Sequence, residues 1–405
     1  MKDNGEIRYF DERDTLFSRT RLLPSTPAFH DYYKRFPERR AIDDELRRLG
    51  GLLRIETAGA LDGEQLHALK PLPPNRLVQF LMRILPLVRT RVESRTKAQI
   101  GAIPSRLPGE DRVRAFMDDS TPIIRDCFEA DRRKKPTSQR VDLPADRATN
   151  LVKEVAKFYG AALVGIAEMQ DYSYYTHRAN GDPIPRNFKY AIVFAVVMPK
   201  ELINRAPHRE TLLATCNGYI DAAHTGARLS GYIKSLGYET SLNCMVSYDV
   251  PLVLLAERAG IGEVSRSNVI VTKEYGNRVR LGAVLTNLPL LADTPADFGL
   301  KDFCMLCGKC AVNCPTRALT SDPPQLVNGS LVWDHHEVRC FKMWMHFATD
   351  CALCIASCPF TQGVDPEKVA SMKGNREVMK AILAEDRRRH GWRARAEVPL
   401  PIAKV

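Results

Sequence analysis

The chain lacks a hydrophobic run long enough to cross a membrane. Its most apolar stretch, Tyr190–Met198, has nine residues, whereas a membrane-spanning helix needs about 20. The opening residues MKDNGEIR contain neither a basic segment followed by an apolar one nor a twin-arginine pair, which are the marks of export signals. Outside one short region only three of the 11 cysteines remain, too few and too scattered for a disulfide framework. We therefore expect a soluble, cytoplasmic protein in a reducing compartment, without a membrane partner.

The other eight cysteines form two runs that each end in Cys-Pro. The first run is Cys304, Cys307, Cys310 and Cys314, and the second is the outlying Cys340 followed by Cys351, Cys354 and Cys358. In two-cluster ferredoxins the cysteine before the proline binds the cluster of the other run. The pattern predicts one [4Fe–4S] cluster on Cys304, Cys307, Cys310 and Cys358, and a second on Cys351, Cys354, Cys340 and Cys314. Pairs of the form C-x2-C also bind zinc, but a zinc site needs no fourth cysteine before a proline. The two runs therefore favour iron–sulfur clusters over zinc, and with them one-electron transfer.

The net charge of +11 admits nucleic acid, a membrane surface or an acidic protein as a partner. Two basic runs stand out, DRRKK at 131–135 and RRRH at 387–390. Neither contains the interleaved aromatic residues that stack on bases, which disfavours a nucleic-acid partner. Solvated surface is the plain interpretation of both runs. The functional interpretation is docking of an acidic ferredoxin or flavodoxin, because opposite charges steer such encounters.

Composition divides the 405 residues into four segments. We expect a charged, proline-rich and largely helical covering region at 1–145, which includes a helix at 76–94, and an α/β core at 146–296. A two-cluster module at 297–362 and a basic tail at 363–405 follow. Within the core, hydrophobic periodicity and breakers predict helices at 146–159, 210–236 and 251–259 and strands at 161–167, 190–198 and 241–246. They also predict a hairpin of strands 269–272 and 279–286 about the turn at Tyr275-Gly-Asn277.

Several segments together resemble the cobalamin-dependent reductive dehalogenases. They are GEVSR at 262–266, YGNRVRLGAVLTNLP at 275–289, FGLKDFC at 298–304, CFKMW at 340–344 and DCALCIASCPF at 350–360, with FDERDTLFSR at 10–19 and YYKRFPE at 32–38. The resemblance implies an α+β fold, a nitroreductase-like corrinoid-binding core with a bacterial-ferredoxin-like module of two [4Fe–4S] clusters. Respiratory members of that family carry a twin-arginine signal, and catabolic cytoplasmic members carry extra flavin and ferredoxin modules. Since this sequence shows neither, we expect the electron donor to be a separate protein.

The resemblance also implies the catalytic residues. In the family a tyrosine delivers the proton and a nearby basic residue favours its phenolate form; the best match here is Tyr219. A phenol with the usual pKa of about 10 becomes an acid–base group near neutrality only if a cation lies against it. Arg278 or Arg280 could supply that cation, with the spacing favouring Arg278, and Asn243 is a candidate contact for substrate or cofactor.

The corrinoid itself is implied by resemblance alone. The Asp-x-His-x-x-Gly loop that supplies a histidine to cobalt in other proteins does not occur, since Asp221 and His224 have the wrong spacing. This agrees with base-off cobalamin. The expected reaction is the replacement of halide by hydrogen on a small organic substrate, aromatic or not. The alternatives are an epoxyqueuosine reductase acting on a tRNA base, for which Asp221 would be the acidic residue over cobalt, a corrinoid-dependent reductase of a non-halogenated metabolite, and a plain two-cluster electron carrier.

Overall fold

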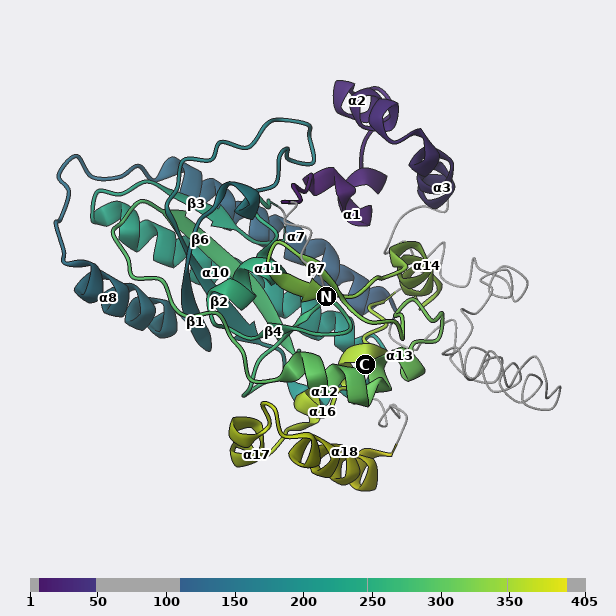
Figure 1. Cartoon of the computed structure of the whole chain (residues 1–405). Coiled ribbons are helices and arrows are strands. Elements are labelled where there is room, and N and C mark those ends of the chain that lie inside the picture. The colour runs from purple at the N-terminus through teal and green to yellow at the C-terminus, as the bar shows by residue number, and fades with distance from the viewer. Residues whose placement is uncertain (1–6, 49–109, 246, 348, 392–405) are drawn as a thin grey trace.

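The computed structural model describes residues 7–48, 110–245, 247–347 and 349–391 (Figure 1). The helix expected at 76–94 lies outside these ranges. None of the helices among the described residues is both long enough and apolar enough to span a membrane.

The centre of the fold is a four-stranded antiparallel sheet. Its strands are β1 (Leu163–Glu168), β2 (Tyr190–Val197), β3 (Thr240–Asn243) and β6 (Val279–Thr286), in the spatial order β1-β2-β6-β3. In β2 the residues Ala191–Val196 are all buried, which explains why this strand reads as a continuous apolar run. An antiparallel sheet with helices packed on it agrees with the α+β class expected from the sequence.

Helices cover both faces of the sheet (Figure 1). On one face lie α10 (Glu210–Ser235) and α8 (Ala145–Phe158), and α7 (Glu110–Arg133) packs against α10. The other face is covered by α11 (Leu252–Arg258). The glycines at 226 and 282 let α10 approach the sheet, because a Cβ at either position would meet the ring of Phe194 at 3.1 Å or less.

The hairpin expected about Tyr275-Gly-Asn277 does not form between its two predicted strands. The strand β5 (Ile270–Val271) pairs instead with β4 (Glu263–Val264), while β6 pairs with β2 and β3. The turn itself exists, as an isolated bridge between Thr272 and Gly276. The local sequence thus predicts the turn correctly, but the pairing of the strands on either side of it depends on tertiary packing, about which the local sequence contains no information.

The N-terminal helices pack on the cysteine-bearing part of the chain. They are η1 (Glu12–Asp14), α1 (Leu16–Thr20), α2 (Pro27–Arg35) and α3 (Pro37–Arg48). Buried Arg19 pairs with Asp43 at 3.0 Å and with Glu337 at 2.5 Å, and Glu337 opens α14 (Glu337–Phe347). The same N-terminal segment reaches the core, because Phe10 forms a bridge with Tyr175. Two further short helices belong to the core, η3 (Asp171–Ser173) and α9 (Lys200–Ile203).

The cysteines lie on a set of short helices and turns. In chain order these elements are α12 (Leu300–Cys307), α13 (Lys309–Asn313), β7 (Gln325–Val327), β8 (Ser330–Val332), α14, α15 (Leu353–Ala356) and α16 (Pro359–Gln362). The segment after them forms α17 (Pro366–Ser371) and α18 (Arg376–His390). These last helices share a hydrophobic core with α12 and α16, so the region around the cysteines continues past residue 362 as far as α18.

Candidate functional site

The structure brings the eight cysteines of the two runs into two groups. Cys310 has Cys304, Cys307 and Cys358 among its electrostatic neighbours, and Cys358 interacts with Cys304 and Cys307. In the other group Cys351 interacts with Cys354, Cys314 and Cys340. The two groups meet where Cys354 also comes near Cys310. Each group thus contains one cysteine from the other run, as the crossed ligand assignment requires.

The chemistry of these thiols suits a metal cluster. Burial, together with the neighbouring cysteines, raises the pKa of Cys304 and that of Cys354 to about 12. Thiolates packed together in this way need a bound cation for charge compensation. Among the described residues no three His, Cys, Asp or Glu side chains converge as ligands of a single metal ion; the four cysteines of a cubane cluster each bind a different iron atom. A cavity beside Ser265, Arg266 and Asn277 is lined by all four cysteines of the first group.

Two buried cations lie beside the first group. Arg266 is 3% exposed and donates from Nε and Nη2 to the backbone carbonyl of Cys304 at 3.2 and 3.1 Å. Lys309, also 3% exposed, pairs with Asp386 of α18 at 2.7 Å. The positive charge of Arg266 favours the thiolate form of Cys304 and Cys307, and that of Lys309 favours the thiolate form of Cys307.

Tyr219 lies on α10 with the guanidinium of Arg280 against its ring, at 4.9 Å from the ring centre. Arg280 comes from β6 and donates from Nη2 to the hydroxyl of Thr215 at 2.6 Å. The same Nη2 lies 3.5 Å from the carboxylate of Asp350. Burial raises the pKa of Asp350, and Arg280 and Thr215 act to lower it.

A glycine makes room for this arrangement. Gly218 precedes Tyr219 in the interior of α10, where glycine costs about 1 kcal/mol relative to alanine. A Cβ at Gly218 would meet Cγ of Arg280 at 2.9 Å, a distance at which one of the two groups must move. The glycine therefore lets the Arg280 side chain cross α10 and reach the ring beside it.

Arg278, the arginine that the spacing favours, lies elsewhere. Its Nη1 donates to the backbone carbonyl of Met198 at 3.1 Å, and its guanidinium lies 5.5 Å from the ring centre of Tyr275. The structure thus brings Arg280 and not Arg278 to Tyr219.

Asn243, at the end of β3, uses its amide within the protein. Its Oδ1 accepts the backbone N–H of Asp249 at 2.6 Å, and its Nδ2 donates to the backbone carbonyl of Ser241 at 3.2 Å. With 1% exposure, Asn243 holds the turn that follows β3.

Two further tyrosines lie near Tyr219. Burial raises the pKa of Tyr175 and of Tyr248 above the usual value of a phenol, although part of the surface of each residue is accessible. Tyr248 interacts electrostatically with Tyr219, Tyr175 and Arg280, so these four side chains lie in one region of the core.

The chemistry of the side chains around Tyr219 fits a bound corrinoid and substrate. Arg280 Nε is buried and has no hydrogen-bond partner among the described residues, which leaves a donor available near Tyr219. Large aromatic walls with a few polar groups are typical of small-molecule sites. The thiols of Cys216 and Cys244 are buried, and burial raises the pKa of Cys216 to about 11 and of Cys244 to about 12, as expected for inert packing residues.

No motif in the sequence identifies three residues of this site, which are Thr215, Tyr248 and Asp350. Thr215 lies one turn before Tyr219 on α10, and Asp350 directly precedes Cys351, so their neighbours in sequence were the available signals. Tyr248 stands in no motif, and only the fold shows its position.

Comparison with known proteins agrees with this arrangement. A family model described as 4Fe-4S dicluster domain matches residues 303–362. Over 272 residues the chain is 30% identical to the tetrachloroethene reductive dehalogenase of Sulfurospirillum multivorans, covering 58% of this chain and 53% of the relative. A shorter match of 136 residues, 31% identical, is to the epoxyqueuosine reductase of Listeria monocytogenes, with 32% of this chain and 35% of that protein covered.

The fold is also similar to a solved structure. The catabolic reductive dehalogenase NpRdhA superimposes with a TM-score of 0.62 and 25% sequence identity, over 67% of this chain and 41% of that one. The chain thus spans about half the length of the Sulfurospirillum relative and less of NpRdhA. The long match to a curated dehalogenase, the similar fold and the dicluster domain show that the chain is similar to reductive dehalogenases in both sequence and fold.

Proposed function

We propose that this protein is a corrinoid- and iron–sulfur-dependent reductive dehalogenase that replaces halide by hydrogen on a small organic substrate. The observation that carries the proposal is the contact of the Arg280 guanidinium with the Tyr219 ring, beside the deeply enclosed Tyr248. Cleaving a carbon–halogen bond reductively consumes two electrons and one proton and releases halide. The site holds a phenol that can give a proton, and the cysteines supply a route for electrons.

Tyr219 would be the proton donor and Arg280 the cation that stabilises its phenolate after the proton has left. When bound, a corrinoid in the base-off state would supply the electrons to the carbon–halogen bond. Its place would be the space bordered by Tyr175, Tyr219 and Tyr248. Arg278 is the weaker candidate for the cation beside Tyr219, because its Nη1 is bonded to the backbone of Met198 and its guanidinium lies against Tyr275. Asn243 is a weaker candidate for a contact with cofactor or substrate, because its amide is bonded within the protein.

The two cysteine groups would each hold one [4Fe–4S] cluster. The group of Cys304, Cys307, Cys310 and Cys358 lies under α18, and the group of Cys314, Cys340, Cys351 and Cys354 adjoins Asp350 near Tyr219. We infer that electrons enter at the first cluster and leave from the second. The core that receives them would be related to the nitroreductase fold. The division into segments at 1–145, 146–296, 297–362 and 363–405 remains our proposal for the chain's organisation.

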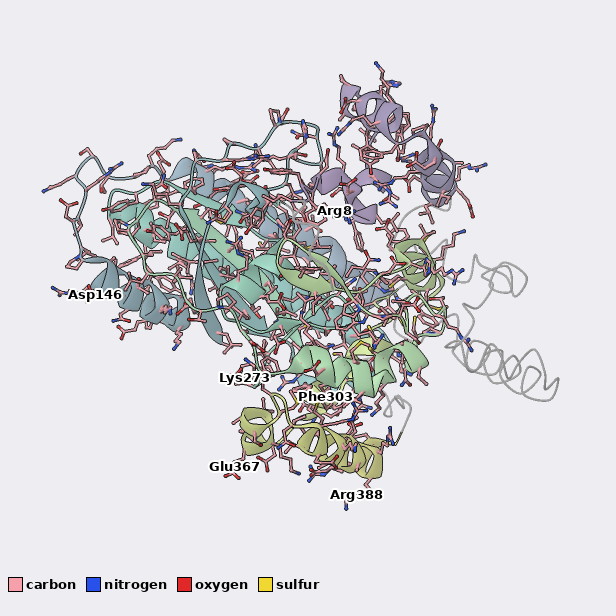
Figure 2. The ribbon with its side chains drawn as sticks, in the orientation of Figure 1. Arg8, Asp146, Lys273, Phe303, Glu367 and Arg388 are labelled. Carbon is pink, nitrogen blue, oxygen red and sulfur yellow. The ribbon has the colours of Figure 1, made fainter. Side chains whose placement is uncertain are left out.

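The donor would be a separate acidic ferredoxin or flavodoxin that docks on α18. Of the two basic runs, 387–390 forms the end of this helix, and α18 packs on the elements that carry the first cysteine group. Arg388 is exposed there and points away from the body of the protein (Figure 2). The run at 131–135 begins in the last turn of α7, which packs on α10. A positive surface over the cluster where electrons enter would both attract an acidic carrier and shorten the electron path.

An epoxyqueuosine reductase activity is the alternative, and the site does not favour it. The acidic residue nominated for that reaction, Asp221, is exposed and its carboxylate accepts a hydrogen bond from Asn217 at 2.8 Å. Reduction of a non-halogenated metabolite uses the same cofactors and differs only in the substrate.

The first experiment is anaerobic production with cobalamin supplied, followed by iron and cobalt analysis and a halide-release assay with titanium(III) citrate as reductant. The proposal expects about eight irons and one cobalt per chain, given two four-iron clusters and one corrinoid. It also expects halide release from chlorinated or brominated organic compounds. A protein with eight irons that binds no corrinoid would contradict the proposal.

A further inference from the structure

The loop that precedes Cys351 leaves the cysteine-bearing region and packs into the core at α10. Asp350 is 6% exposed. The backbone carbonyl of Asp350 accepts a hydrogen bond from the hydroxyl of Thr211 at 2.9 Å, and its carboxylate accepts one from the hydroxyl of Thr215. The two threonines are four residues apart and so lie on one face of the helix. They fix both the backbone and the side chain of Asp350.

On its other side Thr215 binds Arg280. The polar contacts of the Arg280 side chain to described residues are those of Nη2, with the Thr215 hydroxyl at 2.6 Å and the Asp350 carboxylate at 3.5 Å. A guanidinium on a long, flexible side chain needs such partners to keep one position. The position that these partners fix is the one against the Tyr219 ring.

We propose that Asp350 is a positioning residue, which through Thr215 holds the Arg280 guanidinium against Tyr219 and so links the loop of the second cysteine group to the proton-donating pair. This inference rests on the proposed function, since it concerns the same tyrosine and arginine. It adds a residue outside the core to the site. Formation of the cluster beside Cys351 would then order the partners of Tyr219.

A merely structural ion pair between two elements would look similar, and the chain offers one for comparison. Asp131 of α7 and Lys234 of α10 are 7% and 4% exposed, and Asp131 Oδ1 lies 2.7 Å from Lys234 Nζ. The side-chain hydrogen bonds of this pair join the two residues to each other and to Ser230, not to Tyr219 or Arg280. Asp131→Asn therefore removes a buried carboxylate bound to α10 without touching the candidate site or the cysteine groups, and it serves as the matched control.

The test compares three variants, Asp350→Asn, Thr215→Val and the double variant, with the control Asp131→Asn, all loaded with clusters and corrinoid and reduced by titanium(III) citrate. Each of the two single variants at 350 and 215 should lower kcat about tenfold, as expected for losing a hydrogen bond to a charged group. Because both act through one guanidinium, the double variant should lose little more than either single one. Thr215→Ser keeps the hydroxyl and should keep turnover, and Asp131→Asn should stay within about twofold of the unmodified protein.

A second measurement needs neither turnover nor corrinoid. With 3-fluorotyrosine incorporated, the ¹⁹F resonance of residue 219, assigned by its absence in Tyr219→Phe, should shift in Asp350→Asn and Thr215→Val but not in Asp131→Asn. A shift without halide release by the unmodified protein would support the positioning role and overturn the proposed function. Normal turnover and an unmoved resonance in Thr215→Val would overturn the positioning role, even if Asp350→Asn had lost a cluster. Additive losses in the double variant would also overturn it.

Discussion

Replacing Gly218 by alanine should act on stability and activity in opposite directions: it should favour the helix but lower kcat. The added methyl favours the helix by up to about 1 kcal/mol. It would also lie 2.9 Å from Cγ and 3.5 Å from Cβ of Arg280, so the arginine must leave its path across α10. These atoms are near the backbone of the arginine, and a simple rotation of the end of the side chain does not remove the contact.

The expected loss follows from the contact that is broken. A guanidinium against an aromatic ring contributes about 0.5 kcal/mol when exposed and about 2 kcal/mol when desolvated. At about 1.4 kcal/mol per factor of ten, its loss lowers kcat by a factor of about 2 to about 30. Since Arg280 is partly buried, we expect the upper half of this range. The thermal midpoint should stay within a few degrees of the unmodified protein.

The assay is halide release with titanium(III) citrate, run beside thermal unfolding of the same preparations. Gly231→Ala is the control on the same helix, since its Cβ would meet only the end of the Lys134 side chain, at 3.3 Å. This control should keep full turnover. If Gly218→Ala also kept full turnover with both clusters and the corrinoid present, the assignment of Arg280 as the partner of Tyr219 would be refuted.

Four further outcomes follow from the structure. Tyr219→Phe should retain iron and cobalt but lose turnover, and unchanged halide release would rule out the phenol as proton donor. Cys310→Ala should cost one cluster, about four irons, and stop electron delivery; full iron content in that variant would contradict the ligand assignment. Arg388→Glu should slow reduction by an acidic ferredoxin at low salt while Arg132→Glu, at the end of α7, should not, with equal rates for both under titanium(III) citrate. Burial raises the pKa of Glu12 to about 7, and a raised carboxyl pKa means that the stability of the protein falls as pH rises from about 4.5 to about 7. Glu12→Gln should therefore be more stable than the unmodified protein at pH 8, as measured by urea unfolding. If the stabilities of the two proteins depended on pH in the same way, no charge would be buried at Glu12.

The regular elements of the core could be predicted because their signals are local. Tyr190–Val197 is a strand buried on both faces and α10 runs from Glu210 to Ser235, close to the expected bounds, since apolar periodicity and breakers act within the segment. The pairing of the strand at 279–286 could not be read in this way. Its partners β2 and β3 are about 40 to 80 residues away in sequence, and the turn at Gly276 closes only a single bridge.

The grouping of the cysteines was predictable and the partner of Tyr219 was not. Fixed spacings and Cys-Pro pairs carry the cluster pattern within the sequence itself. Arg278 directly precedes β6 and Arg280 lies on it, and spacing alone favours Arg278, which the structure places against Tyr275 instead of Tyr219. The deciding feature is Gly218, a residue of α10 whose missing side chain shows its importance only when β6 is placed beside it.

The candidate site is assembled from three segments that are remote in sequence. Because two of them belong to the core and one to the cysteine-bearing region, neither the core nor that region can form the site alone. Helix α10 supplies Tyr219 and Thr215, β6 supplies Arg280, and the loop before Cys351 supplies Asp350. A core without the cysteine-bearing region would leave the charge of Arg280 half-buried and without its carboxylate, which is costly in a low-dielectric interior. The arginine would then leave the ring for solvent. If Tyr219 and Arg280 are the proton-donating pair that we propose, this pair forms only when the cysteine-bearing region is in place, and the chemistry and its electron supply then depend on the same contacts.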